Sequence, residues 1–189
     1  MIIGITGGTG CGKTTLLKEI EERGGLVLDC DAVSHELLTR DCALLNAIND
    51  RFPGVVVDKK LERKKLGAIV FADEQALQDL NAITHGAIRA EIVRKLAENP
   101  KLAAIDAIAL FEGGLAALCD TTVAVTAPRD SRIERLMARD GITREYAEKR
   151  IDAQKSESWF RKMCDHTLHN DGTQEEFQRK CSEFLDSIL

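Results

Sequence analysis

Short apolar runs alternate with amphipathic stretches in the first and last parts of the chain. Residues 2–6 form the first apolar run, and residues 13–23 carry apolar side chains at helical spacing before two glycines. Further short runs at 26–28, 103–111 and 121–126 predict three more buried strands. Because strands that alternate with helices form a parallel sheet covered on both faces, we expect an α/β fold.

The middle of the chain has a different pattern. Residues 41–99 carry apolar side chains mainly at helical spacing, and only Val55-Val56-Val57 resembles a strand. We therefore expect a helical insertion at 41–99, within a core domain that is formed by residues 1–40 and 100–189.

Helical segments also follow the last predicted strands. Residues 129–139 form one such segment, and Thr143 is typical of the N-cap of the next helix. Thr167-Leu168 indicates a short final strand, and Thr173 and Glu176 have the spacing of a capping box. The chain is therefore expected to end in one more strand and one more helix.

The composition narrows the class of protein. A length of 189 residues fits one domain with a small insertion, and a net charge of −5 disfavours nucleic acid as a partner. No apolar stretch is long enough to span a membrane, and residues 1–5 lack the basic leader of a signal peptide. The six cysteines form no CxxC pair, so we expect reduced thiols and a cytoplasmic protein.

One glycine-rich motif carries specific chemistry. The segment Gly7-Gly8-Thr9-Gly10-Cys11-Gly12-Lys13-Thr14 satisfies the pattern G-x-x-x-x-G-K-[ST]. Its glycines allow a tight turn whose N–H groups point at phosphate oxygens, and the following helix presents its N-terminus to the same anion. We expect Lys13 to reach the β- and γ-phosphates and Thr14 to supply a hydroxyl to Mg²⁺. The motif predicts a site for a nucleoside triphosphate with Mg²⁺ and transfer of the terminal phosphoryl group.

Candidate acid–base residues lie at the ends of two other predicted strands. Asp29 and Asp31 follow the strand at 26–28, where a carboxylate takes a proton from a hydroxyl or holds Mg²⁺ through water; a helix N-cap is the alternative for each. His35, one helical turn beyond Asp31, faces either the same ligand or solvent. Glu112 ends the run at 103–111 and either reaches the metal or is an ordinary loop acid. Because parallel strands place ligands at their carboxyl ends, these residues are expected to share one site.

Basic residues are dense between positions 129 and 162. Most are expected on solvated helix faces, and Arg139 and Arg150 are the best placed to close over a triphosphate. Cys11 lies inside the glycine-rich loop near Lys13, where its thiol is expected either to be acidic or simply to fill the loop.

Seven segments of the chain together carry a family resemblance. They are GITGGTGCGKTT at 4–15, DCDAVSHELL at 29–38, RKKLGAIVF at 63–71, ITHGAI at 83–88, IALFEGGL at 108–115, VTAPRDSRIERLMARDGITREYAEKRIDAQ at 125–154 and HNDGTQEEF at 169–177. In order and spacing, the chain resembles the dephospho-coenzyme A kinases over essentially its full length. The first segment marks any P-loop kinase, whereas the D-x-D-x-x-x-H and L-F-E segments, with R-D followed downstream by Q and N-x-G, make the resemblance specific.

The resemblance implies a function and a set of site residues. The function is ATP-dependent phosphorylation of the ribose 3′-hydroxyl of dephospho-coenzyme A, the last step of coenzyme A biosynthesis. It also implies a P-loop parallel-sheet core, a helical acceptor domain at 41–99 and a small lid at 139–153. By motif position, Asp31 is the base, Lys13 binds the phosphates and Arg139 is a lid arginine. The nucleotide site then comprises Gly8, Gly10, Cys11, Gly12, Lys13, Thr14, Thr15, Asn170 and Gly172, with Thr14 on Mg²⁺, and the acceptor site comprises Asp31, His35, Arg63, His85 and Glu112.

The chain departs from the usual family pattern at Cys11, Cys30 and Gly86, where the family usually has Ser, Ala and Pro. Gly86 is therefore expected to loosen a helix start. Two other functions stay open from the sequence, namely a nucleoside or nucleotide kinase of the same fold and a nucleotide-dependent regulatory ATPase. The sequence makes no prediction of oligomeric state.

Overall fold

The computed structural model describes residues 1–98 and 100–189. The chain divides into two compact units, one formed by Met1–Leu28 with Pro100–Leu189 and the other by Asp29–Asn99. The second unit begins earlier than the insertion expected at 41–99. The reason is that helix α2 (Cys30–Arg40) packs against other helices of that unit and has Val33 and Leu37 buried.

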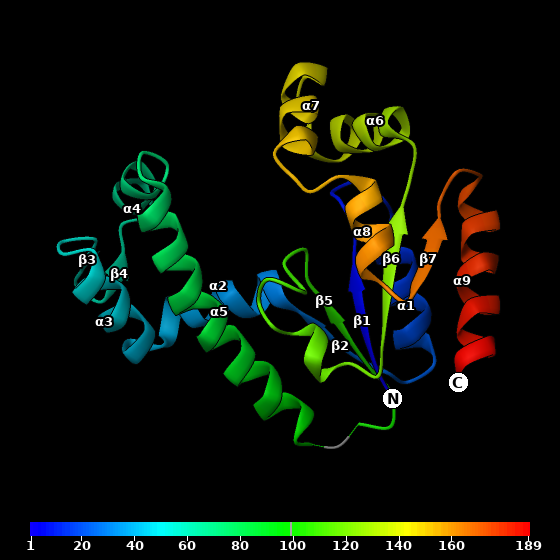
Figure 1. Cartoon of the computed structure of the whole chain (residues 1–189), viewed down its shortest axis with the longest axis horizontal. Helices are drawn as coiled ribbons and strands as arrows, with labels where there is room; N and C mark the ends of the chain where they lie inside the picture. The colour runs from blue at the N-terminus through cyan, green and yellow to red at the C-terminus, as the bar shows by residue number, and fades with distance from the viewer. Residues whose placement is uncertain (99) are drawn as a thin grey trace. The chain divides into compact units, whose positions relative to one another are not determined.

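The first unit contains a five-stranded sheet in the order β2-β5-β1-β6-β7. Its strands are listed here in chain order: β1 (Ile2–Thr6), β2 (Leu26–Asp29), β5 (Ala103–Asp106), β6 (Thr121–Thr126) and β7 (His166–His169). β1 pairs in parallel with both β5 and β6, and β6 pairs in parallel with β7. The predicted parallel α/β fold is therefore confirmed (Figure 1). The strand expected at 103–111 ends early, at Asp106, because turns follow it.

Both faces of the central strand β1 are covered. Ile3 and Ile5 are fully buried in a cluster with residues of helices α1 (Lys13–Glu22) and α9 (Gln174–Ile188), which pack against each other. Gly4 points to the other face, where a Cβ would lie 2.8 Å from Cys119 Sγ and 2.9 Å from a Leu110 methyl. The alternation along β1 therefore buries it on both sides, as expected for a central parallel strand.

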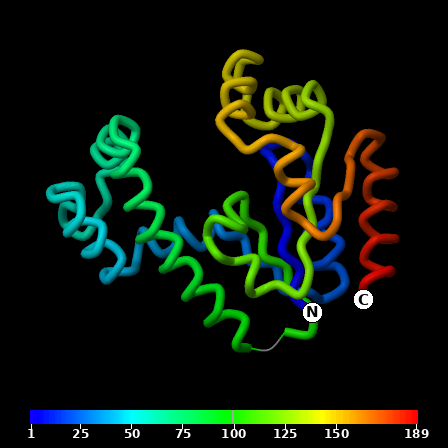
Figure 2. The backbone as a smooth tube through the Cα atoms, in the orientation of Figure 1, coloured from blue at the N-terminus to red at the C-terminus, as the bar shows by residue number. Residues whose placement is uncertain are grey.

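Three short helices connect β6 to β7. They are α6 (Arg129–Asp140), α7 (Arg144–Asp152) and α8 (Glu157–Met163), and the 3₁₀ turn Ala116–Leu118 precedes β6. Gly141 ends α6 in the left-handed region with φ of 64°, and the chain then turns back so that α7 packs on α6 (Figure 2). The predicted lid, residues 139–153, comprises the end of α6 and all of α7.

The second unit is helical apart from one hairpin. Its remaining elements are α3 (Cys42–Arg51), β3 (Val56–Val57), β4 (Lys60–Leu61), α4 (Arg63–Val70) and α5 (Glu74–Leu96). Asp58 and Lys59 have positive φ values of 49° and 61° in the turn that joins β3 to β4. Helix α5 runs without a break through Gly86, so the expected helix start at that residue is wrong. No helix in the described ranges is long and apolar enough to cross a bilayer.

Candidate active site

The glycine-rich loop joins β1 to α1 and leaves backbone donors available. Gly10 and Gly12 have positive φ values of 78° and 100°, and Gly12 is the N-cap of α1. The first turn of α1 contains no acidic residue and Gly12 provides no side-chain cap. Within residues 1–98 and 100–189, the N–H groups of Gly10, Gly12 and Thr14 have no hydrogen-bond partner, whereas the N–H of Lys13 faces the Cys11 thiol. Such unpaired donors at a helix N-terminus form an anion site.

Lys13 lies between this loop and the end of β5. Its ammonium group donates to the carbonyl of Gly7 at 3.4 Å and lies 3.7 Å from Asp106 Oδ1. Both side chains are largely buried, with 15% and 18% exposed. A lysine and a carboxylate therefore meet at the carboxyl end of two adjacent strands, where open α/β sheets place their ligands.

Asp106 is a site residue that the sequence did not predict. The strand was expected to continue to residue 111, so Asp106 lay within it and was not among the candidate carboxylates at strand ends. The single acid within the apolar run 103–111 is the signal that could have identified it. Glu112, the acid predicted at this strand end, is exposed in the turns that follow.

The carbonyl groups of the loop point to side chains from far along the sequence. Arg135 Nη1 donates to the carbonyl of Gly10 at 3.2 Å, and Asn170 Nδ2 donates to that of Cys11 at 3.0 Å. Arg135 Nη2 also donates to Asn170 Oδ1 at 3.2 Å. Asn170 is only 5% exposed and follows β7, where its own N–H donates to the carbonyl of Thr126 at 2.8 Å. Asn170, predicted to flank adenine, thus supports the loop directly.

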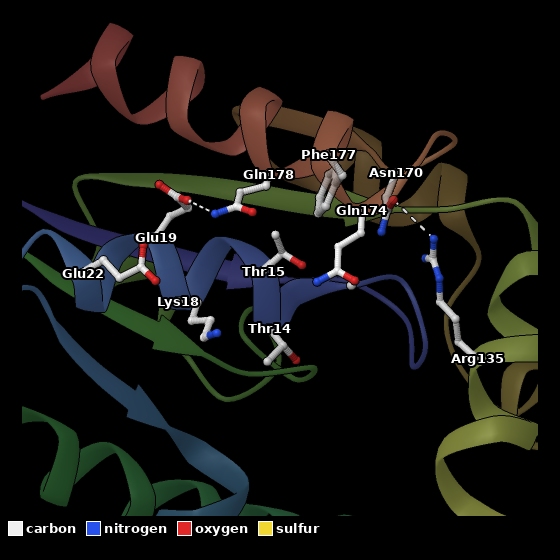
Figure 3. A pocket seen from close by; sticks show the side chains of 11 residues that line it. Thr14, Thr15, Lys18, Glu19, Glu22, Arg135, Asn170, Gln174, Phe177 and Gln178 are labelled. Atoms are coloured by element: carbon white, nitrogen blue, oxygen red, sulfur yellow. Dashed lines mark hydrogen bonds between the residues drawn. The ribbon is translucent and has the colours of Figure 1, made fainter.

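A cavity of about 640 Å³ lies beside the loop and is large enough for a nucleoside. Figure 3 shows its walls, with Thr14 and Thr15 on α1 and Gln174 and Phe177 on α9. Asn170 and Arg135 line the end of the cavity next to the loop. Gly172 is outside this lining and precedes Thr173, which caps α9 in the predicted capping box.

The thiol of Cys11 does not have the acidic character that the sequence analysis considered. Its side chain is 1% exposed and packs in the hydrophobic cluster that β1 forms with helices α1 and α9. Burial raises the pKa of this thiol and outweighs the opposing effect of nearby Lys13. Cys11 therefore fills the loop, and the acidic-thiol interpretation is wrong.

Arg139 and Arg150, the arginines predicted to close over the triphosphate, both contact the carboxylate of Asp140. Arg139 donates to Asp140 through Nε at 2.7 Å and Nη2 at 3.0 Å, and Arg150 Nη1 donates to the same side chain. These hydrogen bonds, first from Arg139 and then from Arg150, hold the pKa of the Asp140 carboxyl well below its usual range. Both predicted phosphate-binding arginines are thus paired with an acid of the lid itself.

Within the helical unit, Asp29 and Asp31 have different surroundings. Asp29 is the N-cap of α2, and its Oδ1 accepts from the N–H groups of Asp31 at 2.8 Å and Ala32 at 3.1 Å. The N-cap alternative therefore applies to Asp29 and is wrong for Asp31. Asp31 is exposed in the first turn of α2, where its carboxylate is not used for capping.

Two of the predicted acceptor-binding residues lie together in the same unit. Arg63 Nη2 and His35 Nδ1 are 2.9 Å apart, although 28 positions separate them in sequence. His35 is on α2, one turn beyond Asp31, and Arg63 begins α4. His85 lies in the middle of α5 and is half-buried.

The fold and the loop together define a class of protein. A glycine-rich phosphate loop between a central parallel strand and a helix, with a lysine on the loop and a carboxylate on the adjacent strand, is the arrangement of a P-loop kinase. A family model described as dephospho-CoA kinase matches residues 1–176. The chain belongs to the dephospho-CoA kinase family, which confirms the resemblance found in the sequence.

Individual relatives agree with this assignment. The chain is 38% identical to a dephospho-CoA kinase of Anaeromyxobacter dehalogenans, covering 99% of this chain and 92% of that protein. It is 37% identical to a dephospho-CoA kinase of Deinococcus radiodurans, covering 99% and 90%.

Solved structures show the same fold. The crystal structure of TT1252 from Thermus thermophilus matches with a TM-score of 0.83 and 33% identity, covering 100% of this chain and 98% of that one. A dephospho-CoA kinase from Campylobacter jejuni matches with a TM-score of 0.70 and 26% identity, covering 99% and 96%. The more distant shikimate kinase of Bacteroides thetaiotaomicron, at 17% identity and a TM-score of 0.58, shares the fold.

Proposed function

We propose that this protein transfers the γ-phosphoryl group of ATP to the ribose 3′-hydroxyl of dephospho-coenzyme A, forming ADP and coenzyme A. The observation that carries the phosphoryl-transfer part is the loop at 7–14, with its unpaired N–H groups and Lys13 paired to Asp106. Membership of the dephospho-CoA kinase family supports the choice of acceptor.

The donor half of the site is assigned to the first unit. The N–H groups of the loop and Lys13 hold the β- and γ-phosphates, and the adjacent cavity receives the nucleoside. Thr15, Asn170 and Gly172 remain the proposed residues near the nucleoside.

The loop also has donors that fit a magnesium ion. No cluster of three or more His, Cys, Asp or Glu side chains suited to a metal occurs among the described residues. Mg²⁺ at a kinase site needs no such cluster, because it keeps waters and takes ligands from the phosphates. The hydroxyl of Thr14 and the carboxylate of Asp106 would hold it, and when bound it neutralises charge on the phosphates.

The acceptor half is assigned to residues of the second unit and to Glu112. Asp31, free of a capping role, orients the 3′-hydroxyl and takes its proton. Arg63 and His35, which contact each other, bind the acceptor together with His85. Arg139 exchanges its contact with Asp140 for the phosphates as the lid at 139–153 closes, which excludes water as a competing acceptor.

The cytoplasm is the proposed compartment. All six cysteines are free thiols in the structure, a state that a reducing compartment maintains.

An acceptor comparison tests this function. ADP formation from ATP and Mg²⁺ would be measured alone, with dephospho-coenzyme A, and with a panel of nucleosides and nucleotides, and the product would be identified by mass. We expect dephospho-coenzyme A to stimulate ADP formation and to yield coenzyme A. Stimulation only by a nucleoside or nucleotide would assign the protein to a different kinase activity. Hydrolysis that no acceptor stimulates would instead indicate a regulatory ATPase.

A further inference from the structure

The backbone of Thr9, inside the phosphate loop, is held on both sides by side chains from distant parts of the chain. Its N–H donates to Gln154 Oε1 at 2.8 Å, and its carbonyl accepts from Arg132 Nε at 2.9 Å. Arg132 Nη2 also donates to the same Gln154 oxygen at 3.4 Å, so each of Thr9, Arg132 and Gln154 contacts the other two. We name these three residues the Thr9 bracket.

The bracket fixes two successive peptide planes. The Gly8–Thr9 peptide is held through the Thr9 N–H and through the Gly8 carbonyl, which accepts from the Cys11 N–H at 3.3 Å. The Thr9–Gly10 peptide is held through the Thr9 carbonyl. Because a trans peptide is planar with its C=O and N–H opposed, fixing the Thr9 carbonyl toward Arg132 directs the Gly10 N–H away from Arg132. That N–H is one of the unpaired donors of the loop.

The approach of Arg132 also explains two glycines that the loop motif leaves variable. A Cβ on Gly8 would collide with the Arg132 guanidinium, and a Cβ on Gly10 would lie 2.8 Å from the Arg132 carbonyl oxygen. Arg132 is only 8% exposed, so its charged group is enclosed by the loop and its surroundings. A buried guanidinium is stable only when its donors are satisfied, and the Thr9 carbonyl satisfies one of them.

We propose that Arg132 and Gln154 are positioning residues that set the phosphate-binding geometry of the loop. They act through the Thr9 backbone. Arg132 lies in α6 before the predicted lid, and Gln154 follows α7 directly after it. The loop is therefore anchored to the two positions between which the lid is expected to move. This inference rests on the proposed function only in requiring that the loop bind a nucleotide.

Matched variants of Gln154 separate positioning from a general loss of structure. Gln154→Met keeps the length of the side chain but removes the acceptor of the Thr9 N–H, whereas Gln154→Glu keeps an acceptor oxygen. Affinity for ADP with Mg²⁺ would be measured by calorimetry in the absence of any acceptor, together with the Tm. We expect about tenfold weaker binding for Gln154→Met, and binding within about threefold of wild type for Gln154→Glu.

A second pair of variants tests the arginine. Arg132→Met should weaken ADP binding, and its effect should be less than additive with that of Gln154→Met because the two residues hold one peptide. Arg129→Met is the matched control, since Arg129 lies one turn earlier on α6 and pairs with Asp152 at 2.6 Å. This control should bind ADP as the wild type does.

The outcomes distinguish the inference from the proposed function. The proposal would be overturned if Gln154→Met bound ADP with wild-type affinity. Equal losses of ADP affinity in Gln154→Met and Gln154→Glu would also overturn it. Additive losses in the double variant would also overturn it. If Gln154→Met fails to fold, Arg132→Lys decides, because a single ammonium cannot reproduce the fork and should still weaken ADP binding. Failure of the wild type itself to bind ADP would count against the proposed function.

Discussion

The phosphate loop and the acceptor helices of this protein are organised in different ways. In the first unit, side chains from α6 and from the segments that follow α7 and β7 donate to or accept from the backbone of residues 9–11. In the second unit, the candidate residues Asp31, His35 and Arg63 are exposed, and the contact between Arg63 and His35 is their main link. The phosphate loop is therefore held in place by the protein itself, whereas the candidate residues of the second unit are exposed side chains that a ligand would arrange.

The two regions restrict the chemistry of their ligands to different degrees. The loop carbonyls accept from protein donors, whereas the N–H groups of Gly10, Gly12 and Thr14 have no partner among the described residues, so the ligand of the loop is evident as an anion. Exposed residues on helices restrict their ligand much less, and the acceptor is therefore inferred from family membership rather than from geometry.

The largest expected effect is on the proposed base in the acceptor unit. Asp31→Asn should lower kcat about 10²- to 10⁴-fold while the KM for ATP stays unchanged, because only proton removal is lost. Asp29→Asn is the matched control, since Asn caps a helix as well as Asp does and turnover should persist. Steady-state kinetics of both variants provide the measurement, and near-normal turnover in Asp31→Asn would remove it from the role of base.

A loss of about 10²- to 10³-fold in kcat is expected for Lys13→Ala in the phosphate loop. The change removes the positive charge that faces the phosphates and leaves Asp106 without its lysine partner. Lys101→Ala, an exposed lysine of the same unit, should have wild-type kinetics. Unchanged turnover in Lys13→Ala would separate the loop from the reaction.

Glycine-to-alanine changes in the two units should have opposite signs. Gly7 has a φ of 141°, and a Cβ there would collide with the backbone carbonyl of Val125, so Gly7→Ala should destabilise the protein by about 3 kcal/mol or more. Gly86 lies within α5 with open space around its Cα, so Gly86→Ala should stabilise by about 0.5–1 kcal/mol. Urea unfolding of the two variants measures both effects, and a destabilising Gly86→Ala would contradict the environment described for α5.

The smallest effect concerns the thiols. Cys42 is exposed in the acceptor unit, whereas Cys11 is buried in the loop, where burial raises the pKa of its thiol. N-ethylmaleimide at pH 7 should therefore modify Cys42 first and Cys11 only on unfolding. Raising the pH through the usual thiol range should activate Cys11 little, because its raised pKa keeps more of the thiol protonated. Peptide mapping by mass spectrometry follows both sites, and equal rates would contradict the burial of Cys11.

Much of the first unit could be predicted because its signals are local. The strand at 2–6, the loop motif and the helix after it depend on residues that are neighbours in sequence, and the capping box at Thr173 is equally local. The end of β5 was harder to predict, since an apolar run continues beyond Asp106 into turns. Helix α8 was not predicted for a different reason, because its short span carries no clear apolar period.

The bonds that hold the loop could not be predicted. Arg132 and Gln154 meet Thr9 across 123 and 145 positions, and nothing in the spacing of basic residues distinguishes Arg132 from its neighbours on α6. Arg139 is predicted to close over the triphosphate, yet in the structure it contacts Asp140. Such pairings arise from tertiary packing, which a pattern along one segment does not contain.

The position of β1 in the sheet has a consequence for synthesis. This strand leaves the ribosome before its partners β5 and β6, which begin at Ala103 and Thr121, after the whole helical unit. At typical rates of about 5–20 residues per second, the apolar segment 2–6 waits roughly 5–20 seconds for its first partner. The helical unit can fold in that interval from local contacts, so the phosphate loop is expected to be among the last parts of the nascent chain to acquire its shape.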